Sequence, residues 1–277
     1  MFWRRTLSVV LLMPLVLLMI YLGSWLFLIL VTAAVLMMQI EYCRLAHQLT
    51  DKINPVIPVL LTVAFGILAF FLPDPLVDIK ASMVVQGLLV GVLIYAFASS
   101  LSRGQVAGEL VTVTLKLTGI ITIGWAFAYH CILLRNIDDI GMQLIVLLIG
   151  TIWCGDTGAY LVGRAIGKHK LITPISPRKT IEGTVAGLIV GVLVSILLCT
   201  FLLQDTLSLL NAAIIGLLLS VFGQLGDLSV SLMKRTVGVK DSGDYIPGHG
   251  GLLDRCDSLM FCAPILYYYI TLSGLIH

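Results

Sequence analysis

A polar segment near the end of the chain, KDSGDYIPGHGGLLDRCDS at residues 240–258, carries the residue types best suited to chemistry. Asp254 and Asp257 are spaced i, i+3 at the start of an apolar stretch, so they share one face of a helix that begins there. Two carboxylates flanking Arg255 suit a divalent metal ion that carries a phosphate. The alternative is helix N-capping, although one Asp would be enough for a cap.

The residues just before this pair predict a loop that closes over a ligand. Ile246-Pro247-Gly248 does not continue a helix comfortably, and Gly250 and Gly251 let the backbone approach a ligand closely. Between the glycines, His249 could donate a hydrogen bond to a phosphate. We therefore expect this segment to contact a phosphate.

A second polar segment, GQLGDLSVSLMKR at residues 223–235, lies within an apolar stretch. Asp227, Ser231 and Lys234 are spaced i, i+4, i+7 and share one helix face. A carboxylate there could hold Mg²⁺, which takes oxygen ligands and binds together with phosphates. The alternative is a buried Asp–Lys pair.

A third segment, CGDTGAYLVGRAIGKHKLITPISPRKTIEG at residues 154–183, adds a carboxylate and a basic loop. Asp156 lies in an apolar stretch, where a charge usually faces a cavity, an ion or a partner helix. A helix start near Thr180 with nearby cations would bind phosphate, although the positive-inside bias of membrane proteins explains the same cations. These cations are Lys168, Lys170, Arg178 and Lys179.

The three segments together favour group transfer at a phosphate, which needs positioning and charge neutralisation more than a side-chain nucleophile. The chain contains no P-loop motif GxxxxGK[ST] and no HExxH motif. Since the polar residues lie at the ends of apolar stretches, we expect a metal-dependent enzyme that acts on a lipid phosphate or a lipid alcohol.

The elements that position these residues are membrane helices. The chain has 277 residues, of which 59% are hydrophobic and 12% are charged, against about 25% charged in soluble domains. This composition predicts an all-α polytopic integral membrane protein. The net charge of +2 gives no support for a nucleic-acid partner, and the six scattered cysteines predict neither disulfides nor a zinc site.

About nine transmembrane helices are predicted, because a span needs about 20 apolar residues. They cover residues 6–22, 24–45, 54–73, 81–99, 112–131, 142–163, 180–203, 207–235 and 256–275. The first stretch resembles a signal peptide, but a second apolar stretch follows at once, so we expect a retained helix with a kink at Pro14.

The distribution of basic residues predicts the orientation. Of the 17 lysines and arginines, one side of the membrane receives only Lys80 and Arg135, and Lys116 lies within the fifth span. All others fall on the side of the N-terminus and the even-numbered loops. The positive-inside rule therefore places the N-terminus in the cytoplasm and the C-terminus on the opposite side.

Two regions are predicted to differ in role. Residues 1–140 are chemically quiet transmembrane helices that face lipid or form an oligomer, and Glu41 there is expected to be an interfacial residue. Residues 141–277 form the catalytic region, with cytoplasmic loops at 164–179 and 236–255 that are rich in glycine, proline, serine and basic residues.

Residues 231–257, SLMKRTVGVKDSGDYIPGHGGLLDRCD, resemble the signature of the phosphatidate cytidylyltransferase (CDP-diacylglycerol synthase) family. That signature reads Ser-x-x-Lys-Arg, four variable residues, Lys-Asp, and then Pro-x-His-Gly-Gly-x-x-Asp-Arg-x-Asp, and every fixed polar position is present. Cys256 stands where the family usually carries an aliphatic residue or threonine. Upstream, GDTGAYLVGRAIGKHKL, SPRKTIEG and Gly226–Leu228 also look like the family, although Ile181 replaces a common tryptophan.

The resemblance implies that CTP and phosphatidate react to give CDP-diacylglycerol and pyrophosphate, with the lipid phosphate attacking the α-phosphorus of CTP. It implies Mg²⁺ held by Asp227, Asp254 and Asp257, and leaves open a second metal ion and a homodimer. The catalytic residues would be Asp227, Lys234, Arg235, Asp254 and Asp257. CTP and phosphate would contact Asp156, Ser176, Lys179, Lys240, His249, Gly250, Gly251 and Arg255.

We expect an integral protein of the bacterial inner (plasma) membrane, and the positive-inside rule places its active site on the cytoplasmic side. Residue patterns alone leave other functions open. The alternatives are a CTP-dependent kinase or cytidylyltransferase acting on a polyprenol or an archaeal-type lipid, or a transporter. A transporter would place its charges near the middle of the bilayer and show paired repeats, and here the charges gather at one face.

Overall fold

The computed structural model describes residues 14–204, 206–243 and 250–275, and the chain divides into two compact units. Unit 1 comprises Met1–Asn136 and Asp241–Asp254, and unit 2 comprises Ile137–Lys240 and Arg255–His277. The polar segment at residues 240–258 is therefore shared between the two units, since its middle belongs to unit 1.

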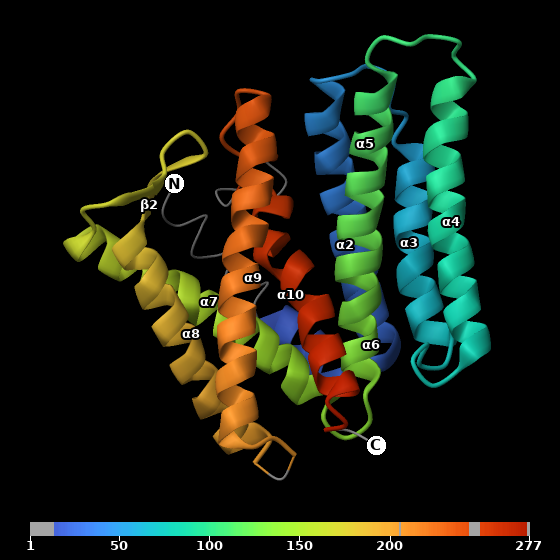
Figure 1. Cartoon of the computed structure of the whole chain (residues 1–277). Helices are drawn as coiled ribbons and strands as arrows, with labels where there is room; N and C mark the ends of the chain where they lie inside the picture. The colour runs from blue at the N-terminus through green and yellow to red at the C-terminus, as the bar shows by residue number, and fades with distance from the viewer. Residues whose placement is uncertain (1–13, 205, 244–249, 276–277) are drawn as a thin grey trace. The chain divides into compact units, whose positions relative to one another are not determined.

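Unit 1 is built from helices that lie side by side, as Figure 1 shows for α2, α3 and α4. Their bounds are α2 (Ser24–His47), α3 (Val56–Phe71), α4 (Ile79–Leu101), α5 (Glu109–Gly119), the π-helical η1 (Ile120–Tyr129) and α6 (His130–Asn136). The last three run on without a break as one long helical stretch. This stretch packs against α2 and α3, and α4 packs against α5.

Glycines allow these helices to approach one another closely. A Cβ atom on Gly119 would lie 2.5 Å from the Tyr42 ring, and one on Gly124 would lie 3.0 Å from the Cα of Thr62. The Tyr42 hydroxyl donates to the carbonyl of Leu115 at 2.9 Å. Small residues at helix contacts are typical of membrane helices, which associate through close packing.

Arg135 of α6 stabilises the end of the helical segment at residues 14–22, just before α2 begins. Residues 14–22 are helical, and Gly23 then takes a φ of 63°. The Arg135 guanidinium donates to the carbonyls of Ile20 at 2.8 Å and Tyr21 at 3.0 Å, which are left without partners at a helix end. Residues 6–13 of the predicted first span lie outside the described residues, so the predicted kink at Pro14 stays a prediction.

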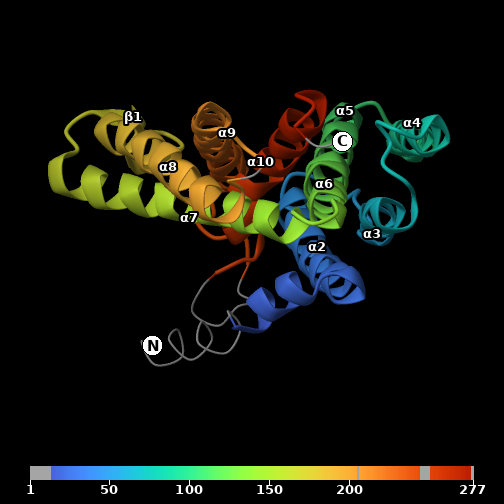
Figure 2. The same ribbon diagram turned by 90° about the horizontal axis from the view of Figure 1, so that it is seen from below.

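Unit 2 is formed by four helices and a small hairpin, and Figure 2 shows α7 and α8 running side by side. The helices are α7 (Gly141–Ile166), α8 (Ile181–Leu202), α9 (Leu209–Thr236) and α10 (Leu253–Leu272), of which α10 begins in unit 1. A Cβ on Gly187 would lie 2.9 Å from that of Ala159, and one on Gly216 would lie 2.7 Å from the Cα of Val192. Glycines therefore bring α7, α8 and α9 into close contact.

The predicted loop at 164–179 contains the one departure from an all-α fold in the described residues. There β1 (Lys170–Ile172) pairs antiparallel with β2 (Ser176–Thr180), with Lys170 opposite Thr180 and Ile172 opposite Ser176. Pro177 is accommodated because strands in a two-stranded sheet have an open edge, where a missing N–H is tolerated. The hairpin gives the basic loop a defined backbone.

The helical, polytopic membrane class predicted from composition is confirmed. Within the described residues, six helical stretches are long and apolar enough to cross a bilayer: Ser24–His47, Ile79–Leu101, Glu109–Asn136, Gly141–Ile166, Ile181–Leu202 and Leu209–Thr236. α3 is apolar but has only 16 residues, which is short for a span. The count of nine and the sides of the two termini stay predictions.

Candidate active site

The polar face of α9 carries the first group of candidate residues. Ser231 donates to Asp227 Oδ1 at 3.3 Å, as their spacing on one helix face predicts. The other oxygen of Asp227 forms an ion pair with Lys179 Nζ at 2.5 Å, so a residue of β2 approaches this face. Lys234, one turn beyond Ser231, is almost fully buried. A carboxylate and two ammonium groups therefore gather at this end of α9.

Asp257 of α10 belongs to the same group in unit 2. Its side chain is buried, and Oδ1 accepts the backbone N–H of Ser258 at 2.7 Å. Asp257 interacts electrostatically with Asp227 and with Lys234. Carboxylates from two different helices thus lie close to one another and to a buried lysine.

Gly226 explains how α10 comes so close to α9. A Cβ atom at Gly226 would lie 2.4 Å from the carbonyl oxygen of Asp257, a distance that real side chains do not occupy. The glycine next to Asp227 is therefore required by packing, and it sets the separation of Asp227 from Asp257.

Gly226→Ala is expected to destabilise the protein, because the two backbones have to move apart and overpacking costs about 1–3 kcal/mol. Gly87→Ala in α4 is the matched control, because nothing lies within 4 Å of its Cβ position. Alanine there is expected to keep or raise stability through its higher helix propensity. The unfolding temperatures of both variants are measured in detergent. Equal temperatures would contradict the requirement for glycine at position 226.

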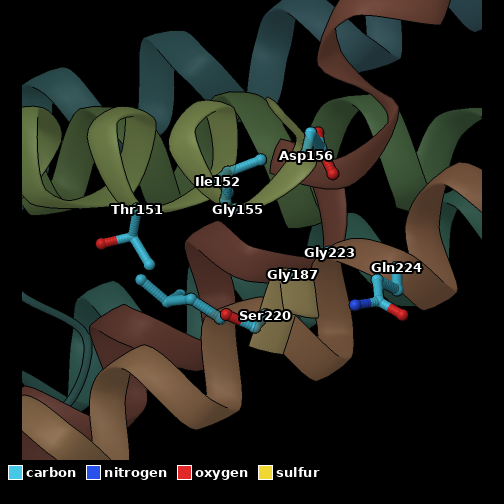
Figure 3. Close-up of a pocket in the computed structure, with 9 residues that line it drawn as sticks. Thr151, Ile152, Gly155, Asp156, Gly187, Ser220, Gly223 and Gln224 are labelled. Atoms are coloured by element: carbon cyan, nitrogen blue, oxygen red, sulfur yellow. The ribbon is translucent and has the colours of Figure 1, made fainter. Parts of the chain in front are cut away.

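Asp156 of α7 lies at a small pocket between α7, α8 and α9, as Figure 3 shows. Other polar residues of this pocket are Ser220 and Gln224, and the Gln224 side chain donates to the carbonyl of Thr184 at 3.2 Å. Asp156 interacts electrostatically with Asp227 and with Lys179. Asp156 is exposed and lines this pocket, which is one of the surroundings expected for it.

The start of α8 differs from the predicted phosphate site. The Thr180 hydroxyl accepts the N–H of Gly183 at 3.1 Å, and so occupies one of the donors that a phosphate would use. Glu182 in the first turn pairs with His169 at 2.6 Å and adds a negative charge. Of the cations in this loop, it is Lys179 that reaches the carboxylate group.

Arg235 lies at the end of α9 and binds backbone carbonyls. Its guanidinium donates to Ile175 at 3.2 Å, in the turn of the hairpin, and to Val239 at 2.9 Å. Arg235 thereby fastens the hairpin to the segment that follows α9. This contact suggests a positioning role for Arg235 beside the catalytic role that the resemblance implies.

The remaining predicted residues are distributed as follows. Lys240 and Arg255 are exposed, Ser176 is half-buried in β2, and Gly250 has a φ of 78°. His249 lies outside the described residues. Gly251 is buried against other protein atoms, and a Cβ there would lie 2.6 Å from Glu41 Oε2.

Asp254 is the second residue of α10 and lies in unit 1, where it accepts hydrogen bonds from Ser242. The backbone N–H of Ser242 donates to Oδ2 at 2.8 Å, and the hydroxyl lies 3.1 Å from the same oxygen. This residue is half-buried, so its carboxylate fixes the segment that precedes the helix.

Glu41 is the residue whose role sequence reasoning missed. The expectation of an interfacial side chain is wrong, because Glu41 is 0% exposed. Its carboxylate accepts hydrogen bonds from Ser242, Leu252 and Leu253. The only signal in the sequence was a lone acid in an apolar helix, which does not identify a partner.

The carboxylate group in unit 2 is chemically suited to a hard cation. No three His, Cys, Asp or Glu side chains among the described residues are close enough together to hold a metal ion by themselves. Mg²⁺ does not need three protein ligands, because it is commonly held by one or two carboxylates together with water and substrate phosphates. Asp227 and Asp257 fit that donor set.

Comparisons with known proteins show which family the chain resembles. A stretch of 166 residues is 42% identical to the phosphatidate cytidylyltransferase of Bacillus subtilis, covering 58% of this chain and 61% of that protein. The enzyme of the same name from Synechocystis is 36% identical over 195 residues, covering 70% of this chain and 63% of the relative. The matched stretches thus span about three fifths of these two relatives.

A third relative, the phosphatidate cytidylyltransferase of Staphylococcus saprophyticus, is 36% identical over 203 residues, covering 73% of this chain and 75% of the relative. The sequence profile of the cytidylyltransferase family matches residues 3–273, which is nearly the whole chain. The polar signature and the grouping of its carboxylates and lysines on membrane helices are in agreement with that match. The chain therefore belongs to the cytidylyltransferase family.

Proposed function

We propose that this chain transfers the cytidylyl group of CTP to phosphatidate, giving CDP-diacylglycerol and pyrophosphate. The family match and the names of the relatives support this activity. The structural observation that carries it is the group formed by Asp227, Asp257 and Lys179 in unit 2, with Asp156 and Lys234 beside it. Such a group can hold both a cation and phosphate oxygens.

In the proposed reaction, a phosphate oxygen of phosphatidate forms a bond to the α-phosphorus of CTP. The bond from that phosphorus to the oxygen bridging to the β-phosphorus breaks, and the electron pair leaves with pyrophosphate. The substrate supplies the nucleophile, so the protein has to orient two anions and neutralise their charge.

Lys179 and Lys234 are the cations available to neutralise phosphate charge within the carboxylate group. Asp227 is held in place by Ser231 and Lys179 before any ligand binds. We propose that Asp227 and Asp257 hold Mg²⁺, and that Asp254 contributes as the signature implies. When bound, Mg²⁺ would stabilise negative charge on the phosphate oxygens.

A labelling experiment tests the activity. Purified full-length protein in detergent receives phosphatidate, Mg²⁺ and CTP labelled at either the α- or the γ-phosphate. We expect the α label to enter the lipid and the γ label to leave as pyrophosphate. Transfer of the γ label to a lipid alcohol such as a polyprenol would indicate a kinase instead, and no transfer at all would contradict an enzymatic function.

For the membrane arrangement, we propose nine spans with the N-terminus and the active site on the cytoplasmic side of a bacterial inner membrane. The concentration of basic residues in the loops at 164–179 and 236–255 supports this side. Single cysteines placed at Lys170 and Lys80 in sealed vesicles are expected to react from opposite sides. A mass measurement of the purified protein tests whether it forms a homodimer.

A further inference from the structure

Glu41 is a fully buried acid within residues 1–140, which carry none of the residues of the proposed site. It lies near the end of α2 with a relative exposure of 0%. Burying a carboxylate is unfavourable unless hydrogen bonds or a cation replace its water. No ion pair to Glu41 is present among the described residues, so its stabilisation comes from hydrogen-bond donors.

All of these donors come from the polar segment at residues 240–258. The backbone N–H of Leu252 donates to Oε1 at 3.0 Å, and that of Leu253 donates to Oε2 at 2.8 Å. The Ser242 hydroxyl lies 2.9 Å from Oε2. One carboxylate thus contacts the chain on both sides of residues 243–251, and it fixes the two ends of that stretch relative to each other.

The two backbone donors belong to the start of α10, which begins at Leu253. The first N–H groups of a helix have no partner within the helix, and the helix dipole favours a negative charge there. Glu41 therefore acts as an N-terminal cap that a different helix supplies. Hydrogen bonds to an ionised acceptor are stronger than neutral ones, so this cap holds the first turn firmly.

Ser242 connects Glu41 to Asp254. Its hydroxyl lies 2.9 Å from Glu41 Oε2 and 3.1 Å from Asp254 Oδ2, and it has one hydrogen to donate. Its backbone N–H donates to Asp254 at 2.8 Å. The position of the Asp254 carboxylate therefore depends on Ser242, which Glu41 holds from the opposite side.

The glycines of this segment are explained by the same contact. A Cβ atom on Gly243 would lie 2.9 Å from Glu41 Oε1, and one on Gly251 would lie 1.8 Å from Ser242 Oγ. Any side chain at either position would push the carboxylate or the hydroxyl away. Gly251, which the sequence assigned to ligand approach, is needed here so that Glu41 can reach its donors.

We propose that Glu41 is a positioning residue for the reaction, which fixes both ends of residues 243–251 and thereby presents Asp254 before substrate or metal binds. This inference rests on the proposed function for its catalytic consequence. Its structural part is that Glu41 protects the Leu252 and Leu253 amides from hydrogen exchange, and this protection does not depend on any ligand.

Glu41→Gln is the test, since glutamine keeps the size but turns one acceptor into a donor that opposes a backbone N–H. Hydrogen exchange is followed at the Leu252 and Leu253 amides in full-length protein without nucleotide or metal. We expect their exchange to be at least tenfold faster than in wild type. Exchange at the wild-type rate in the folded variant would overturn the inference.

The second measurement is the Mg²⁺ concentration that gives half-maximal formation of CDP-diacylglycerol. We expect it to rise about 10- to 100-fold in Glu41→Gln, as for residues that orient a ligand of a metal. Ser242→Ala, which leaves both backbone bonds of Glu41 in place, should show a smaller shift in the same direction. An unchanged Mg²⁺ requirement in an active variant would contradict the positioning role.

Glu109→Gln is the matched control, because Glu109 is also a buried glutamate of unit 1 but pairs with Lys52 and Arg103. It should leave both the amide exchange and the Mg²⁺ requirement unchanged, even if it lowers the unfolding temperature. Inactive wild-type protein would count against the proposed function alone. Active wild type with normal exchange in Glu41→Gln would count against the role of Glu41 alone.

Discussion

Asp227→Asn is expected to lower the rate of CDP-diacylglycerol formation by roughly 10²–10⁴-fold, the range that several kcal/mol of lost charge stabilisation by a metal would give. Asparagine keeps the shape of the side chain but removes the charge that pairs with Lys179. The hydrogen bond from Ser231 can still form to the amide oxygen. We therefore expect the turnover rate to fall while the protein stays folded.

Asp78→Asn is the control for this change, because it removes the same charge outside the proposed site. Asp78 caps α4 by accepting the N–H groups of Lys80 and Ala81, and asparagine caps helices about as well. The control should keep wild-type turnover. Initial rates at saturating CTP and several Mg²⁺ concentrations compare the two, and near-normal rates in Asp227→Asn would refute its catalytic role.

The second large effect is expected from Lys179→Met, which should lower kcat/KM for CTP by about 10²-fold. Methionine keeps most of the length of the side chain but supplies no charge to the phosphates. Removing one such donor from a site of developing negative charge typically has an effect of about this size. Because the pair with Asp227 is partly exposed, its loss should change stability by no more than about 1 kcal/mol.

Lys170→Met in the same hairpin is the matched control, because Lys170 is exposed and lies in β1 opposite Thr180. Its kcat/KM should stay within about twofold of wild type if general positive charge on the hairpin is unimportant. An equal loss in both variants would assign the effect to the overall charge of the hairpin. That result would contradict a specific role for Lys179.

The sequence predicted best the features that depend on neighbours along one helix. Asp227 and Ser231 share a face because their spacing is fixed by helix geometry, and the bond between them confirms it. The hairpin at 170–180 was missed because its short strands lack the alternation of apolar and polar residues that marks a buried strand.

Features that depend on distant partners could not be predicted. Hydropathy places Glu41 at the end of a span, but the donors of its hydrogen bonds are residues more than 200 positions away. Gly251 was expected to let the backbone approach a ligand, and in the structure its Cβ position is taken up by the side chains of Ser242 and Glu41. A single sequence can indicate that a glycine is needed for close packing, but it does not identify the group that packs against the glycine.

The long separation between Glu41 and its donors also bears on how the protein is made. Unit 1 receives its last segment, Asp241–Asp254, only after the first three helices of unit 2 have been synthesised. Contacts so far apart in the chain form late, because a long loop has to close first. A chain that stops before Leu252 would leave the acid of α2 without its backbone donors, which is unfavourable in a buried position. We therefore expect α2 to complete its packing only after the start of α10 has been synthesised.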